Sequence, residues 1–255
     1  MTERIIGPLP FQDSSDHELT PENSLLQQEI SKAKKSSDDL KMILNADKTK
    51  AFVINYSHNY QFRPRLRVPG SDDDLEVVTS VKLVGVTLSA DLKFHEHVTK
   101  MVKSANGKMW MLRRLKEFGL AEKDLIEIYT LFIRSRLEYC APAWNASLTQ
   151  GDKDEIERIQ KTMLKIVHGD DYEDYACALQ KSNLTTLEER REALCLTFAL
   201  KCTGDPKHKA LFKLNENTFH HYPTKFTPPF CQNERYSKSP VPYLTGLLNE
   251  YYQKL

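Results

Sequence analysis

The chain has 255 residues, of which 40% are hydrophobic and 28% are charged, and its formal net charge is +1. This length and apolar content suffice to bury a core, in one large domain or two small ones. The near-neutral total excludes a chain that is basic throughout and binds nucleic acid along its whole length, and equally a solvating acidic tail. Any function driven by charge must therefore depend on a local cluster.

The cysteines and the apolar runs indicate the compartment. Five cysteines occur at wide spacings without a Cys-x-x-Cys pair, which argues against a zinc ribbon and suits free thiols in a reducing compartment. The first residues lack the apolar core of a signal peptide, and no run approaches the roughly 18 apolar residues of a membrane span. We therefore expect an intracellular protein, cytoplasmic or nuclear, with no membrane partner.

The first part of the chain predicts a small α+β segment at 20–92. Residues 1–19 show no hydrophobic period, and we expect them to be disordered. Thr20 and Pro21 then predict the start of a helix that runs toward Leu40, because threonine caps a helix and proline suits its first position. Runs of β-branched and aromatic residues predict strands at Lys50–Tyr56 and Val81–Leu88.

From residue 93 the apolar residues recur at steps of three and four, which predicts an all-α bundle at 93–203. In the first helix the apolar stripe consists of Val98, Met101, Val102, Ala105, Met109 and Leu112. Further helices are predicted at about 121–139, from Gly151 to Gly169, and from Thr186 onward. We interpret Tyr129, Tyr139 and Trp144 as core aromatics, because they lie on apolar helices.

Residues 204–255 turn polar and rich in proline, so we expect a poorly ordered tail with no more than a short helix at its end. The predicted fold class is therefore α+β, with a small sheet and helix followed by an all-α bundle.

No complete catalytic or metal site is predicted. His95-x-His97 and several acidic pairs lack further ligands at a suitable spacing, so we interpret them as structural or solvated residues. No Walker loop, GxGxxG motif or nucleophile elbow is present. Arg190 and Arg191 follow two glutamates, which favours ion pairing within one helix.

The strongest local charge lies between Lys93 and Phe118, where seven basic residues and two acidic residues give a net charge of +5. Lys93, Lys100 and Lys103 share the face away from the apolar stripe. Such a face can bind the phosphates of a nucleic-acid backbone, and the alternative is an ordinary solvated helix face.

Three segments match, in order, the motifs of one known family. Leu44–Lys50 (LNADKTK) is similar to an LN-x-x-KT motif, and Lys82–Val86 (KLVGV) resembles a K-[YF/L]-L-G-V strand. Leu92–Val98 (LKFHEHV) resembles an L-x-W-x-x-H-V motif, with Phe94 at the tryptophan position. The family is that of the reverse transcriptases, or RNA-directed DNA polymerases, of non-LTR (LINE and jockey-like) retrotransposons. In that family these motifs belong to the late palm, to the hairpin beside the primer end and to the start of the thumb.

Three later segments continue the resemblance, which covers about residues 45–191. They are similar to the family motifs IY…S-x-LEY…W, LE-x-IQ and L-x-x-RR, and they lie at Ile128–Trp144, Glu157–Lys161 and Leu187–Arg191. The resemblance implies the C-terminal part of a reverse-transcriptase domain, with the end of the palm at 20–92 and a thumb-like bundle at 93–203.

The family's chemistry is phosphoryl transfer by Mg²⁺ ions that three aspartates hold. The first aspartate belongs to a palm strand upstream of every matched segment, so we expect it to be missing. Phe11–Ser14 (FQDS) looks like a decayed copy of the turn that carries the other two, with Asp13 as the remnant. A serine hydroxyl lacks the charge with which a carboxylate binds Mg²⁺. We therefore expect no polymerisation by this chain alone and no cofactor.

What the resemblance implies instead is weak, sequence-independent binding of primer-template nucleic acid, RNA or DNA. It places Lys82 and Gly85 near the primer end. It also makes the first thumb helix a candidate for phosphate contact through Lys100, Lys103, Lys108, Arg113 and Arg114. Other partners that stay open are a missing palm-and-fingers segment, which would complete an enzyme in trans, and another protein bound by a helical interaction module. A translated relic of the element without function also stays open.

Overall fold

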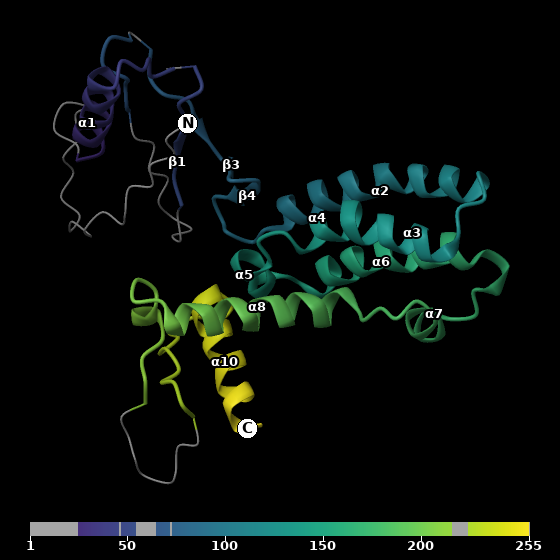
Figure 1. Ribbon diagram of the computed structural model, residues 1–255. Coiled ribbons are helices and arrows are strands. Elements are labelled where there is room, and N and C mark those ends of the chain that lie inside the picture. Colours follow the sequence, from purple (N-terminus) through teal and green to yellow (C-terminus); the bar gives the residue numbers. More distant parts are fainter. Residues whose placement is uncertain (1–24, 46, 55–64, 72, 216–223, 255) are drawn as a thin grey trace. The chain divides into compact units, whose positions relative to one another are not determined.

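A computed structural model describes residues 25–45, 47–54, 65–71, 73–215 and 224–254 (Figure 1). The chain divides into two compact units, Met1–Leu92 and Lys93–Leu255. Most of the described residues are helical, and the small β part belongs to the first unit. This composition is compatible with the predicted α+β class.

The first unit contains one helix and two small sheets. The helix is α1 (Leu25–Asp39). The sheets pair β1 (Ala51–Phe52) in parallel with β2 (Val77–Val78), and β3 (Ser80–Leu83) in antiparallel with β4 (Val86–Ser89).

A small apolar cluster holds α1 to the loops of the first unit. The buried members are Ala51, Leu66, Val68 and Leu75, and Leu26 and Ile30 of α1 pack against them together with Leu44. The side chain of Gln27 adds a polar clamp, because its amide donates to the carbonyl of Arg67 at 2.8 Å and accepts from the N–H of Arg67 at 3.0 Å. The helix is thus attached by both kinds of contact.

The strand predicted at Val81–Leu88 is in fact a hairpin, and the turn is made by Val84 and Gly85. Their φ angles are +44° and +87°, and a two-residue turn with positive φ at both positions matches the twist of the flanking strands. Glycine adopts this conformation freely, whereas valine does so only at a steric cost. The sequence VKLVGVTL contains no turn signal other than Gly85, and for this reason it was predicted as one strand.

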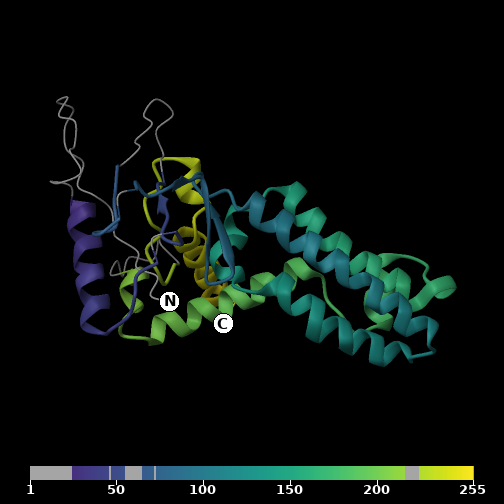
Figure 2. The same cartoon turned by 90° about the horizontal axis from the view of Figure 1, so that it is seen from above.

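The second unit is a bundle of helices (Figures 1 and 2). Its longest helices are α2 (His95–Glu117), α6 (Gln150–His168), α8 (Leu187–Gly204) and α10 (Pro240–Gln253), and α3 (Glu122–Tyr129) is shorter. A π-helical segment, Thr130–Arg134, which we call the π turn, joins α3 to α4 (Ser135–Glu138). The other short helices are α5 (Ala141–Trp144), α7 (Tyr175–Lys181) and α9 (Glu234–Ser237).

The core of this unit lies between α2 and α6, which run side by side in both views of the cartoon (Figures 1 and 2). The predicted apolar stripe of α2 is confirmed, since all six of its residues are buried, together with His97. The facing residues of α6 are Ile156, Ile159, Met163, Leu164 and Val167.

The end of the chain differs from the poorly ordered tail expected at 204–255. Among the described residues there, α10 packs on α8 and α5 and buries Leu244 and Leu248. Asn249 of α10 donates to the carbonyl of Phe226 at 3.0 Å and accepts from its N–H at 2.8 Å, as a neighbouring strand would. Two prolines lie in the first turn of α10, where they suit a helix rather than break it.

The end of α6 is fixed by a lysine of α2. Lys116 Nζ donates to the carbonyls of Ile166 and Val167 at 2.7 and 3.0 Å, and so satisfies acceptors that the last turn leaves open. Gly169 ends the helix with φ +59°, and a Cβ at this position would lie 2.7 Å from Lys116 Nζ. One basic residue of the charged stretch therefore has a structural role.

Replacing Gly169 by alanine should destabilise the second unit. The substitution strains the backbone and displaces the Lys116 ammonium from both carbonyls, so we expect the free energy of unfolding to fall by about 1–3 kcal/mol in urea denaturation. Gly107→Ala is the matched control, because an added Cβ there meets no atom within 4 Å and alanine favours a helix interior by up to about 1 kcal/mol. An unchanged midpoint for Gly169→Ala would contradict the role of this junction.

Candidate functional site

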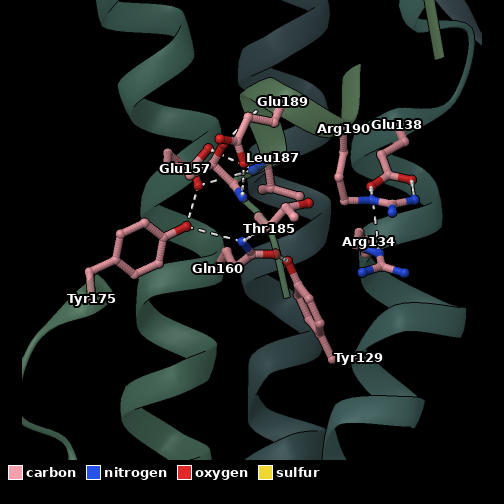
Figure 3. A network of polar contacts seen from close by, with 11 residues as sticks. Tyr129, Arg134, Glu138, Glu157, Gln160, Tyr175, Thr185, Leu187, Glu189 and Arg190 are labelled. Atoms are coloured by element: carbon pink, nitrogen blue, oxygen red, sulfur yellow. Dashed lines mark hydrogen bonds and ion pairs between the residues drawn. The ribbon is translucent and has the colours of Figure 1, made fainter. Parts of the chain in front are cut away.

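A partly buried polar network joins α6, α7 and α8, and Figure 3 shows it from close by. The carboxylate of Glu157 accepts from the N–H of Leu187, at 3.1 Å to each oxygen, and from the hydroxyl of Tyr175. Leu187 is the first residue of α8, whose amide has no partner within its own helix, so the carboxylate completes the start of α8. Burial and the hydrogen bond to Glu157 raise the pKa of Tyr175, which keeps its hydroxyl a donor.

Gln160, one turn further along α6, is fully buried and uses its whole amide group. Its Oε1 accepts from the hydroxyl of Tyr129 at 3.0 Å. Its Nε2 donates to the hydroxyl of Tyr175 at 3.0 Å and to the carbonyl of Thr185 at 2.8 Å. Burial raises the pKa of Tyr129 well above its usual value, so this hydroxyl stays neutral. One amide therefore ties α3, α7 and the segment before α8 to α6.

Beside this network, two arginines meet one carboxylate (Figure 3). Glu138 of α4 binds Arg190 of α8 through both carboxylate oxygens and lies 3.5 Å from Arg134 of the π turn. The hydrogen bond to Glu138 raises the pKa of Arg190, whereas burial lowers the pKa of Arg134. The cluster joins the helix after the π turn to α8.

The predicted pairing of Arg190 and Arg191 with the glutamates before them is wrong. Glu188 binds Lys153 of α6 at 2.6 Å, and Glu189 accepts from a backbone amide in the capping box of α8. Both acids are thus engaged at the start of the helix, and the arginines turn toward other segments of the bundle.

Arg191 is fully buried and links α8 to the end of the chain. Its Nε donates to Asn145 at 3.0 Å, and Asn145 donates to the hydroxyl of Tyr243 in α10 at 3.0 Å. Both Nη atoms of Arg191 lack a hydrogen-bond partner among the described residues, and burial lowers its pKa. Burial also raises the pKa of the nearby Cys195 to about 12, so this thiol is unreactive.

These polar groups form a scaffold, and none of them is placed as a reaction centre. The tyrosines are neutral, the thiol is protonated, and the carboxylates of Glu138 and Glu157 are taken up by partners within the bundle. The basic residues that the sequence predicts as a site lie instead mainly on the surface of α2.

The exposed face of α2 carries most of the basic residues that the resemblance singles out. They are Lys100, Lys103, Arg113 and Arg114. The first and the last each bind a glutamate of the same helix, at 2.6 and 2.8 Å. Lys103 and Arg113 form no ion pair with any residue that the structure describes. Exposed pairs within one helix contribute little, so all four cations are accessible to an anion.

Lys108 differs from its neighbours because it reaches the π turn. Its Nζ donates to the carbonyl of Phe132, a residue of the π turn, at 3.1 Å. Burial and the charge of Arg136 lower the pKa of Lys108. Arg136 Nη1 donates to Ser104 Oγ at 3.4 Å, and no described carboxylate pairs with either cation. Two like charges therefore lie near each other at the edge of the basic face.

Large apolar side chains are exposed on the same helices. Trp110 of α2 is 64% exposed, and Leu131 and Phe132 of the π turn are 58% and 55% exposed.

Of the predicted core aromatics, Tyr129 and Trp144 are fully buried, whereas Tyr139 is exposed. Tyr139 lies at the end of α4, where its carbonyl accepts a hydrogen bond from the indole of Trp144 and its ring lies outside the core.

The remaining predicted site residues belong to the first unit. Lys82 and Gly85 are exposed on the β3–β4 hairpin, which belongs to the first unit. Asp13 lies outside the described residues. Within the described ranges, no group of three or more His, Cys, Asp or Glu side chains is arranged to hold a metal ion. No helix there combines the length and the apolar character needed to cross a membrane.

The two histidines at the start of α2 go to different partners. His95 Nδ1 lies 2.6 Å from Asp152, the buried residue that forms the capping box of α6 with Thr149. His97 packs edge-on against Trp144, with 5.6 Å between the ring centroids, and burial lowers its pKa. Their contacts therefore fix the start of α2 against α6 and α5.

Comparison with known proteins finds no matching family model, no matching curated protein and no matching solved structure. The function must therefore be inferred from the residues and geometry of the chain itself.

Replacing Gln160 by leucine should destabilise the bundle strongly. The variant leaves the Tyr129 hydroxyl and the Thr185 carbonyl buried without partners, and each such group costs about 1–3 kcal/mol. We expect the free energy of unfolding to fall by about 2–4 kcal/mol, measured by urea denaturation. Gln180→Leu, at an exposed position of α7, is the matched control and should be nearly neutral. Equal losses in the two variants would refute the central role of Gln160.

The His95–Asp152 contact predicts a stability difference that depends on pH. The hydrogen bond and the charge of Asp152 raise the pKa of His95. Burial raises the pKa of Asp152, but the hydrogen bonds from Thr149 and His95 outweigh it and leave the pKa lowered. A raised histidine pKa stabilises the fold below the unfolded value of about 6.5, and this contribution is lost as pH rises through the folded value.

His95→Gln should therefore destabilise the chain more at about pH 5.5 than at about pH 9, where histidine is neutral in both states. The measurement is the free energy of unfolding of both proteins at the two pH values. A difference that is the same at both would show that the contact does not depend on the imidazolium charge.

Proposed function

We propose that the chain binds nucleic acid without sequence preference, through the exposed basic face of α2 and the adjoining Lys108 and Arg136. The observation that carries the proposal is the presence of cations that are not neutralised within the described protein, above all Lys103, Arg113 and Arg136. A phosphate backbone neutralises such charges and releases its own counterions, which drives binding.

The type of side chain supports binding without sequence preference. Exposed lysine and arginine side chains contact the phosphates of the backbone, and such contacts position a nucleic acid without reading its sequence. A net charge of +5 on one stretch of a chain with a total of +1 concentrates this attraction on α2.

We further infer that the chain derives from the reverse transcriptase of a non-LTR retrotransposon. On this interpretation the first unit corresponds to the end of the palm and the second to the thumb. The family motifs support this inference, because they occur in the same order along the chain between about residues 45 and 191. So do the hairpin at the KLVGV segment and the unit boundary after Leu92, where the thumb motif begins. We expect no polymerisation by the chain alone, since the matched segments do not include the family's catalytic aspartates.

A protein-interaction module is the second candidate function, and the exposure of the π turn favours it. Leu131 and Phe132 present apolar surface beside the basic face, and such surface often marks a protein contact. Nucleic-acid binding requires the cations of α2, whereas a protein contact through the apolar residues does not. Substitution of those cations therefore distinguishes the two functions.

The double variant Lys103→Glu/Arg113→Glu should weaken binding of a labelled RNA–DNA primer-template, measured by fluorescence anisotropy at several salt concentrations. We expect the Kd to rise at least tenfold at low salt. The slope of log K against log salt should fall in magnitude by about 1.4–1.8, because each lost phosphate contact removes about 0.7–0.9.

Lys201→Glu/Lys207→Glu is the matched control, since it makes the same charge change at exposed lysines outside α2. Equal weakening by both double variants would mean that only net charge matters and would reject α2 as the site. Absence of binding at low salt by the folded native chain would reject nucleic-acid binding and leave the interaction module.

A further inference from the structure

Trp110 is the one feature of the basic face that phosphate binding does not explain. It is 64% exposed in the middle of a long helix, whereas the other tryptophan of the chain, Trp144, is fully buried. In the part of the chain that the structure describes, no aromatic ring or cation lies against its indole. An exposed indole leaves a large flat apolar surface in water, which a ligand with a flat π-face can cover.

The residues around Trp110 on α2 indicate which class of ligand its indole can bind. Lys103, Gly107, Trp110 and Arg114 follow one another at steps of four, three and four, so they share one face of the helix. All four are exposed, and Gly107 has nothing within 4 Å of the position of a Cβ. The glycine therefore leaves open space between the ammonium of Lys103 and the indole.

A nucleic-acid strand offers the two kinds of group that this face can bind, because a negative phosphate alternates with a flat base along it. Two helical turns separate Lys103 from Trp110, and Arg114 follows one turn later, about 1.5 Å per residue along the axis. A base-paired duplex keeps the faces of its bases stacked inside and shows only their edges in the grooves, so its bases cannot lie flat against an indole. Unpaired bases can turn outward and stack on an aromatic ring.

We propose that Trp110 is a stacking platform for an unpaired nucleobase, and that the basic face of α2 therefore prefers single-stranded nucleic acid over duplex. This inference rests on the proposed nucleic-acid binding and adds the class of ligand to it. Lys103 and Arg114 contact phosphates of the same strand on the two sides of Trp110. An apolar protein partner fits less well, because it would bury these cations without an anion to neutralise them.

The two tryptophans make a direct test available. Stacking quenches the emission of Trp110, and the buried Trp144 does not contact the ligand. The full chain is titrated with a 12-nucleotide oligothymidylate, with an oligomer of equal length that carries abasic sugars in place of the bases, and with a duplex of equal length. Each titration is repeated with Trp110→Ala, with Trp110→Phe, and with Phe198→Ala, an exposed aromatic of α8 that serves as control.

We expect quenching by the oligothymidylate, none by the abasic oligomer, and weaker binding of the duplex. Trp110→Ala should raise the Kd for the oligothymidylate about 5- to 100-fold, the contribution of one stacked base, and leave the Kd for the abasic oligomer unchanged. Trp110→Phe should restore part of the affinity, and Phe198→Ala should bind like the native chain.

The results that overturn the inference differ from those that overturn the proposed function. Binding of the oligothymidylate and the abasic oligomer with equal affinity, without quenching and without an effect of Trp110→Ala, would refute stacking and leave phosphate binding intact. Failure of the native chain to bind any of the three ligands would refute both. Quenching that depends on protein concentration alone would show that Trp110 is covered by a second copy of the chain, and would refute the inference as well.

Discussion

The amide of Gln160 is the contact on which the helical unit depends most. It lies at the centre of the bundle, and its partners belong to three different segments. Apolar packing alone would allow α3, α7 and α8 to slide along α6, because the hydrophobic effect has no direction. Hydrogen bonds from a buried amide do have direction, and with Glu157 at the start of α8 they define one register for the whole unit. This rigidity holds α2 and its surface charges on a fixed scaffold.

The scaffold separates the charged residues of the chain into two groups. Lys116, Arg134, Arg190 and Arg191 have partners or positions inside the bundle and serve its stability. The cations on the outward face of α2 contribute little to stability, and this leaves them available for a ligand. A net charge counted along the sequence does not distinguish the groups, although only the second can attract a polyanion.

The sequence predicts the elements with a clear period and misses those defined by one contact. The apolar stripe of α2 and the helices at 121–139, 151–169 and beyond Thr186 follow from steps of three and four, since burial of one face requires that period. The turn at Val84 and the packed helix α10 were not predicted, because each depends on tertiary partners that a local pattern does not contain. The charge of Lys108 was evident in the sequence, but its bond to the π turn was not, since the distance between the two positions along the chain is 24 residues.

The π turn explains how a strict spacing of four residues is buried. Leu125, Tyr129, Ile133 and Leu137 are all buried, yet in a regular α-helix each step of four drifts by about 40° around the axis. The wider turn rotates less per residue and cancels this drift, so the four side chains stay aligned on α2 and α6. The alignment therefore depends on the number of residues in the π turn and not on the type of their outward side chains. Its outward side chains can change freely, while the loss or gain of a single residue would rotate Glu138 and everything after it away from its partners. Over evolutionary time, such a segment should accept substitutions readily and resist any change in length.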